Sequence, residues 1–398
     1  MPTRLGFWLA VGVLGAVAVG GTLPIPLYPV YQMDFGFSML VLSGIFAGFP
    51  VGLAMSLLCL GCASDRLGRR IVLLAALVVA AAAGVLFLAA SSVAWLVAAR
   101  VVSGIAVGLA TPAAGAAIAE LEPHGDLHRA SLLTAVVTVG GLGIGPLASG
   151  VLAEYTSAPR TVPWAAYLGV LAAAAVALFF VPETMTERPG AMSLMPRLTH
   201  LPADMRFTFV RATATAVAAF SAIGFFSSLV PSLLKSALGR PNHALGGLVV
   251  FSLFAATAIG QVGGRRLGRR RAIAPGLVLT AIGLAVVAVG FSDASIALVV
   301  LGAILGGLGA GLAVMGGLGL LNAACPPEHR AEILSAYFTV TYLSSALPVI
   351  AAAFMAQHVG TVSATVMVAG WIGLLVVALL AVSRLGGVPA PGSGPASL

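Results

Sequence analysis

Charged residues are scarce in this chain, and the group best placed for electrostatic chemistry is the stretch GCASDRLGRR over residues 61–70. Asp65 and Arg69 stand four residues apart, a spacing at which an acid and a base pair on one helical turn. The pentapeptide RLGRR returns at 266–270, but there Arg265 occupies the place of the acid. The first turn therefore predicts an ion pair, whereas the second predicts a purely basic turn that anchors the chain.

A second unusual charge, Arg100, falls inside a long apolar segment. A charge within a membrane is costly enough to be a functional candidate, although an arginine near a helix end also extends its charge to the membrane surface. No acidic residue lies near the middle of any apolar segment. Asp34 and Glu154, at the ends of such segments, are therefore the candidates for proton coupling with Arg100.

The elements that must position these residues are membrane-spanning helices. The chain of 398 residues is 60% hydrophobic and 8% charged, with a mean hydropathy of +1.09. Runs of about 20 apolar residues are long enough to cross a bilayer as helices, and lipid requires each span to satisfy its own backbone. We predict an all-α integral membrane protein with twelve spans, over 6–30, 39–62, 70–90, 94–119, 130–154, 163–182, 206–232, 243–263, 271–291, 295–322, 331–356 and 362–383.

The basic residues set the orientation of these spans. A net charge of +8 would suit a nucleic-acid partner, but most of the 20 Lys and Arg residues fall in alternate loops, which excludes that reading. Cytoplasmic loops carry such an excess of positive charge. We therefore predict a multi-pass protein of the cell (inner) membrane with both termini cytoplasmic. We expect it to contact lipid, to act as a monomer and to bind no nucleic acid.

The two halves of the sequence follow one plan. Besides the repeated basic turn, HRA at 128–130 returns at 329–331, again just before a predicted span. We infer two six-helix bundles related by pseudo-two-fold symmetry, an arrangement that recurs in transporters with a substrate site between the repeats. The predicted parts are an N-terminal bundle over 1–184, a central cytoplasmic loop over 185–205, a C-terminal bundle over 206–384 and a disordered cytoplasmic tail over 385–398.

The turn at 61–70 resembles the signature loop of the major facilitator superfamily, Gly-x-x-x-Asp-Arg-x-Gly-Arg-Arg/Lys. It matches at every fixed position, namely Gly61, Asp65, Arg66, Gly68, Arg69 and Arg70. The resemblance implies the fold of that superfamily and a cytoplasmic charge cluster that stabilises the outward-facing state. It also implies that this cluster acts as a conformational gate, with Glu120 or Glu122 as its acidic partner. The alternative is that these charges only set the topology.

Two further stretches are similar to motifs of the same family. GLGIGPLASG over 141–150, with Gly141, Gly145, Pro146 and Gly150, resembles the fifth-span motif of exporters, although Ser149 replaces one glycine. Small residues also serve ordinary helix packing, and Pro146 predicts a helix bend. The arginine-glycine pattern that starts at Arg100 resembles a fourth-span motif linked to proton transfer. Exporters of cationic drugs in this family often carry an acid in mid-membrane, so its absence disfavours a cationic substrate.

Polar and aromatic residues within the aliphatic spans are candidates for a substrate cavity. They are Thr22, Ser103, Thr111, Thr138, Ser221, Phe225, Phe226, Ser227, Tyr337, Thr341 and Tyr342. Any of the hydroxyls can instead bond to its own helix. Together the residues predict an apolar, aromatic and hydroxyl-lined cavity, which suits an amphipathic or lipophilic small molecule.

The sequence contains no catalytic or nucleotide-binding motif, and we expect neither an enzyme nor a cofactor or metal. Cys59 and Cys62 form a pair with no second pair or histidine near it. We predict a secondary transporter that exports a small molecule by alternating access, as a proton antiporter. The alternatives are an importer or facilitator of a small metabolite and, from another class, a membrane enzyme or receptor.

Overall fold

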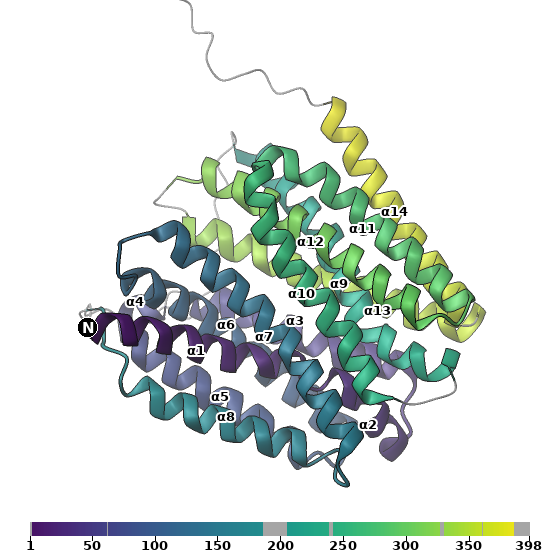
Figure 1. Cartoon of the computed structure of the whole chain (residues 1–398), viewed down its shortest axis with the longest axis horizontal. Helices are drawn as coiled ribbons and strands as arrows, with labels where there is room; N and C mark the ends of the chain where they lie inside the picture. The colour runs from purple at the N-terminus through teal and green to yellow at the C-terminus, as the bar shows by residue number, and fades with distance from the viewer. Residues whose placement is uncertain are drawn as a thin grey trace, which may run out of the picture.

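The structure, a computed structural model, describes residues 2–61, 63–185, 205–238, 242–326, 330–359 and 361–385. These residues form helices joined by short turns, and no strand occurs among them (Figure 1). Ten helices in the described part are long and apolar enough to cross a membrane, and α8 and residues 369–379 of α14 are shorter apolar segments. The predicted all-helical membrane protein is confirmed. Cys62, nearly all of the predicted central loop and nearly all of the tail lie outside the described residues.

The helices fall into two groups along the chain. The first group comprises α1 (Pro2–Thr22), η1 (Ile25–Leu27), α2 (Tyr28–Phe35), α3 (Met39–Leu60), α4 (Ser64–Leu67), α5 (Arg69–Leu88), α6 (Val93–Glu120), α7 (Leu127–Tyr155) and α8 (Val162–Leu178). The second group comprises α9 (Arg206–Leu238), α10 (His243–Leu267), α11 (Arg269–Ser292), α12 (Ile296–Ala324), α13 (Arg330–Val359) and α14 (Thr361–Leu385).

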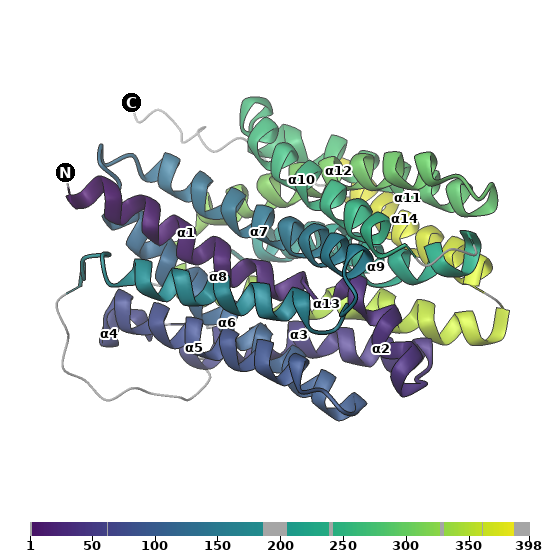
Figure 2. The ribbon, with the colours of Figure 1, turned by 60° about the horizontal axis from the view of Figure 1, so that its bottom comes forward.

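Each group packs as a bundle, and the bundles lie side by side (Figures 1 and 2). Helices α3, α5 and α6 pack together in the first bundle, as do α10, α11 and α12 in the second. The bundles meet where α7 packs against α10 and where α3 packs against α13. These two pairs of helices form most of the seam, and η1 and α2 add smaller contacts with α9 and α10.

The first predicted span is not the single helix expected over 6–30, because η1 interrupts it between α1 and α2. Pro24 and Pro26 lack the N–H that a continuous helix requires. The interruption leaves backbone carbonyls free for other partners, and that of Leu23 accepts a hydrogen bond from Oγ of Ser149 at 2.7 Å. Broken spans of this kind expose backbone groups at transporter sites.

The two ends of the molecule differ in charge. We call the end with the turns between α3 and α5 and between α10 and α11 the basic end, because Arg66, Arg69, Arg265 and their neighbours gather there. The other end, called the opposite end, holds the ends of α2 and α7 and the start of α10.

Candidate functional site

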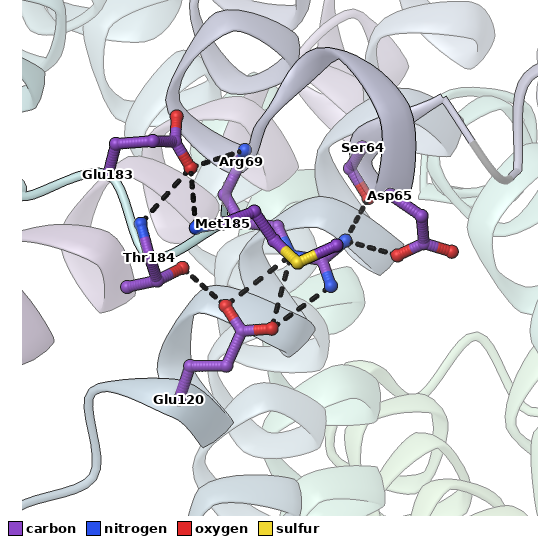
Figure 3. A network of polar contacts seen from close by, with 7 residues as sticks. All are labelled: Ser64, Asp65, Arg69, Glu120, Glu183, Thr184 and Met185. Carbon is purple, nitrogen blue, oxygen red and sulfur yellow. Dashed lines mark hydrogen bonds and ion pairs between the residues drawn. The ribbon is translucent and has the colours of Figure 1, made fainter. Parts of the chain in front are cut away.

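Arg69, the first residue of α5, joins three elements at the basic end (Figure 3). Its Nη1 donates to Oδ1 of Asp65 at 2.5 Å and to Oγ of Ser64 at 2.7 Å. On its other side, Nη2 donates to Oε1 of Glu120 at 3.0 Å. The buried guanidinium therefore ties α4 and the end of α6 to the start of α5.

Glu183, which follows the last span of the first bundle, binds the backbone of the same turn. Its Oε1 accepts the N–H of Arg69 at 2.9 Å and its Oε2 accepts the N–H of Arg70 at 3.0 Å. The first N–H groups of a helix have no partner within it, and a negative charge there is favourable. Burial raises the pKa of Glu183, but the backbone hydrogen bonds outweigh burial and hold that pKa below its ordinary value. Thr184 completes the cluster, since its hydroxyl donates to Glu120.

Gly68 shapes this turn in two ways. Its φ of 91° lies in the region that favours glycine, and a methyl group on it would lie 2.8 Å from Oε2 of Glu183. Gly268 has a similar φ of 82°, but nothing lies within 4 Å of where its methyl group would be. The two turns therefore share a backbone shape, but a carboxylate packs only against the first.

The remaining residues of the signature turn lie around the cluster. Arg66 is half-buried in α4. The guanidinium of Arg70 lies 5.3 Å from the ring centre of Phe179. Gly61 ends α3 facing the second bundle, where a methyl group on it would lie 3.5 Å from Oγ of Ser335 in α13.

Glu122, the other acid considered for Arg69, belongs to a separate turn. It accepts the N–H groups of His124 at 2.7 Å and Asp126 at 2.8 Å, and Nη1 of Arg129 lies 3.3 Å from it. Burial raises the pKa of Glu122, but the interactions with Asp126 and His124 outweigh burial and hold that pKa below its ordinary value. Of the two acids, the structure places Glu120 at the signature turn, and Glu122 orders the connection to α7.

Arg100, in α6, is fully buried inside the protein. Its Nη1 donates to the backbone carbonyl of Gly21 at 2.6 Å, at the end of the α1 segment that η1 interrupts. Its guanidinium lies 4.7 Å from the ring centre of Phe49 and 5.5 Å from that of Phe46. Its Nε is buried without a partner in the described structure.

Asp34 and Glu154 lie at the opposite end, and neither forms an ion pair with Arg100 in the described structure. Asp34 pairs with Arg160 at 3.0 Å. Glu154, at the end of α7, accepts the first N–H of α10 from His243 at 2.8 Å. Because α7 and α10 belong to different bundles, the Glu154 carboxylate links the two bundles at this end.

A central cavity of about 80 Å³ lies between the bundles. Arg100 lines it, together with four of the predicted cavity residues, Thr22, Thr138, Ser227 and Tyr342. Sequence reasoning missed Phe46, Phe49, Phe220, Phe254 and Gln261, which also line it. Phe46 and Phe49 stand three residues apart, so the sequence alone could have placed both on one face of a helix.

The other predicted cavity residues lie elsewhere, and two of them bond to their own helices. Thr111 donates to the carbonyl of Val107, and Thr341 donates to that of Tyr337, each one helical turn earlier. This is the local alternative that hydroxyls within a span have to a cavity, although Thr138 makes the same kind of bond and does line the cavity. The residues outside the cavity lining are Ser103, Thr111, Ser221, Phe225, Phe226, Tyr337 and Thr341.

The glycines of the fifth-span motif make close contacts between helices. Helix α1 leaves no room for a side chain at Gly141, which meets Cβ of Ala18, or at Gly145, which meets the carbonyl of Val19. A methyl group on Gly150 would lie 3.3 Å from Cα of Gly247 in α10, across the seam between the bundles. Pro146 lies within α7, which continues to Tyr155. The motif thus lies on the helix that faces both α1 and the second bundle.

A larger space of about 860 Å³, called the vestibule, lies at the basic end between α7, α10 and α12. It is lined by His128, Arg265, Arg269 and Arg270, among others, and Nη1 of Arg265 donates to the carbonyl of His128 across the seam at 3.3 Å. The vestibule and the central cavity share lining residues, including Gln261. The two spaces therefore adjoin.

Within the described residues, no group of three or more His, Cys, Asp or Glu side chains could hold a metal ion. What the arrangement can do is bind a molecule between two bundles, with a charge cluster that stiffens one of them.

Comparison with known proteins identifies one family. The model of the Major Facilitator Superfamily matches residues 10–266 and 212–397. The quinolone resistance protein NorA of Staphylococcus aureus is 26% identical over 184 residues, which are 46% of this chain and 47% of NorA. The chain therefore matches less than half the length of that relative.

Two solved structures share the fold over nearly the whole chain. A bacterial homologue of the human lysosomal transporter Spinster has a TM-score of 0.76 at 14% identity, covering 98% of this chain and 99% of the homologue. The nucleoside transporter NupG has a TM-score of 0.74 at 11% identity, covering 95% of this chain and 99% of NupG.

Proposed function

This chain belongs to the major facilitator superfamily of transporters, and on that premise we propose that it exports a small amphipathic or lipophilic molecule by alternating access. The observation that carries the proposal is the central cavity between the bundles, which adjoins the vestibule at the basic end. At the other end, the bundles are linked through Glu154 and His243. A site accessible from one side at a time is the requirement for alternating access.

We place the basic end in the cytoplasm, because positive charge accumulates in cytoplasmic loops. Both termini then lie on the cytoplasmic side of the cell membrane, and the described conformation receives substrate from the cytoplasm. We also propose that the protein acts as a monomer. The direction of net transport rests on the fifth-span motif with Gly145 and Pro146 and on the partial similarity to NorA.

Proton antiport is the proposed source of energy, and Glu154 is the acid best placed to couple it. As a carboxylate it accepts the N–H of His243 and links the bundles. Protonation from the outer side would remove the negative charge and weaken this hydrogen bond. The outer end would then open, release the substrate and leave a proton on the transporter.

The test is accumulation of a panel of lipophilic dyes and antibiotics in cells that express the chain. We expect lower accumulation with the intact protein than with Asp65→Asn, and reversal by a protonophore. Asp65→Asn removes the ion pair to Arg69 but leaves the spans unchanged, so equal membrane levels of both proteins are the control. No difference for any compound at equal levels would refute export of this compound class.

A further inference from the structure

Among the described residues, the charged side chains that line the central cavity and the vestibule are all basic. Arg100 is the one charged side chain that lines the central cavity in the described part of the chain. Arg265, Arg269 and Arg270 line the vestibule, and no aspartate or glutamate lines either space among the described residues.

No acidic side chain among the described residues forms an ion pair with Arg100. In the described structure, its one hydrogen bond is the 2.6 Å contact from Nη1 to the carbonyl of Gly21, and its Nε has no partner. The rings of Phe46 and Phe49 lie near the guanidinium and attract it weakly. Burying an ion without an opposite charge is unfavourable. An anion in the cavity would supply that charge and accept the free N–H groups.

We propose that the central cavity binds an amphipathic organic carboxylate, with its carboxylate on Arg100 and its apolar body against the aromatic residues of both bundles. A planar guanidinium matches a carboxylate with two parallel hydrogen bonds. Phe46 and Phe49 come from the first bundle, and Phe220 and Phe254 from the second. The inference rests on the proposed function and names the substrate class for the same cavity.

The charged residues of the vestibule also favour an anionic substrate. Clefts lined by charges of one sign concentrate ions of the other sign, so Arg265, Arg269 and Arg270 would draw an anion toward the cavity. Arg265 occupies the place that Asp65 holds in the first turn. Because the second turn has Arg265 where the first has Asp65, the second turn has no ion pair of this kind, and the vestibule has a positive charge at this position where an aspartate would be negative.

The size of the cavity requires that it expand on binding. A space of about 80 Å³ holds a few water molecules, whereas sites for drug-sized ligands enclose roughly 300 Å³ or more. Because both bundles line the cavity, a small separation of the bundles enlarges it. The anion would thus bind as the seam between the bundles opens.

An anionic substrate also accounts for the absence of an acid in mid-span. A monoanion that leaves a cell moves with the inside-negative potential, which favours its exit about 50-fold per 100 mV. Export of such a substrate draws on the membrane potential, whether or not protons are exchanged. A buried carboxylate in the cavity would instead repel it.

The test is equilibrium binding by calorimetry to the purified full chain at pH 7, in a chloride-free buffer. The probes are 4-phenylbutyrate, 4-(1-naphthyl)butyrate and 4-(1-pyrenyl)butyrate, each with its primary amide and its corresponding amine. We expect at least one carboxylate to bind tenfold or more tightly than its amide, and the amines to bind most weakly. This comparison within the native protein does not depend on any variant.

Variants then assign the preference to Arg100. Arg100→Gln should abolish the tenfold preference for the carboxylate, and Arg100→Lys should retain part of it because the charge remains. Arg211→Gln is the matched control, because Arg211 also lies within a span but lines a separate pocket with Phe207 and Val210. Thermal melting checks that each variant is folded.

Three results would overturn the inference. Amides or amines that bind as tightly as every carboxylate would show that the cavity has no anion preference. Binding of added chloride without any carboxylate preference would indicate an inorganic anion site. If Arg211→Gln lost the carboxylate preference as fully as Arg100→Gln, the preference could not be assigned to Arg100. Transport of a neutral or cationic compound in the cell assay would leave the proposed export function standing in each case.

Discussion

Glu183 lies 114 residues after Arg69, yet its carboxylate accepts the backbone N–H of Arg69 at 2.9 Å. The segment that leaves the first bundle is thereby fastened to the turn that starts α5. Glu120 and Asp65 hold the side chain of the same arginine. All of these residues belong to the first bundle, so in this conformation the cluster stiffens one bundle and does not latch the two together.

Replacing Glu183 with Gln should lower stability by about 1 kcal/mol, the usual cost of losing a helix cap. The amide has one acceptor oxygen in place of two and no charge to oppose the partial positive charge at the start of α5. The measurement is thermal melting of the purified protein. Asp293→Asn, which removes one acid at the other end of the molecule, is the control and should melt as the native protein does.

The stability contributed by Glu183 should depend on pH in a defined direction. Its pKa is lower in the folded protein than its ordinary value of 4.5. Folding therefore favours the ionised form, and this contribution is present above about pH 4.5 and is lost as the pH falls through the folded pKa. Melting temperatures between pH 7 and pH 3 should fall less steeply for Glu183→Gln. Equal slopes for the two proteins would contradict the assignment.

Gly68→Ala should destabilise the protein more than Gly268→Ala. Both glycines have positive φ, with values of 91° and 82°, and ψ near 150°, so each alanine carries a similar backbone strain of about 1–3 kcal/mol. Only the alanine at 68 also pushes against Glu183, 2.8 Å away. A larger drop in melting temperature for Gly68→Ala is the expected result, and equal drops would mean that the carboxylate contact adds nothing.

Glu154→Gln should make the central cavity more accessible from outside. The variant lacks the charge that binds the N–H of His243, so the link between α7 and α10 weakens. The measurement is the rate at which a membrane-impermeant maleimide labels a cysteine placed at Ser227, with Cys59, Cys62 and Cys325 replaced by serine. We expect faster labelling than in the same protein with Glu154 intact. Asp293→Asn should leave the rate unchanged, and an unchanged rate in Glu154→Gln would exclude this link as the outer closure.

Hydropathy was sufficient to predict the helices, because each span satisfies its backbone locally. The break in the first span could also have been predicted, since Pro24, Pro26 and Pro29 lie close together. The pairing of Asp65 with Arg69 follows from their spacing in a helical turn. These features depend on neighbours in the sequence.

Features that depend on contacts between residues far apart in the sequence could not be predicted from it. Glu120 and Glu122 are two residues apart, and only the end of α6 at Glu120 decides which of them reaches Arg69. Nothing local to Glu183 indicates that it faces the start of α5. Likewise, the rotation of each span decides which hydroxyls face the cavity, and hydroxyls such as that of Thr341 are satisfied within their own helices.

The central claim is that the protein moves its substrate out of the cytoplasm by an ordered conformational cycle. The most direct measurement is uptake into everted membrane vesicles, using the compound with the largest difference in the cell assay. Everted vesicles expose the cytoplasmic face, so energised uptake reports export. We predict uptake with the native protein, none with Asp65→Asn at an equal protein level, and collapse on adding a protonophore. Uptake only in right-side-out vesicles, or equal uptake with Asp65→Asn, would contradict the account.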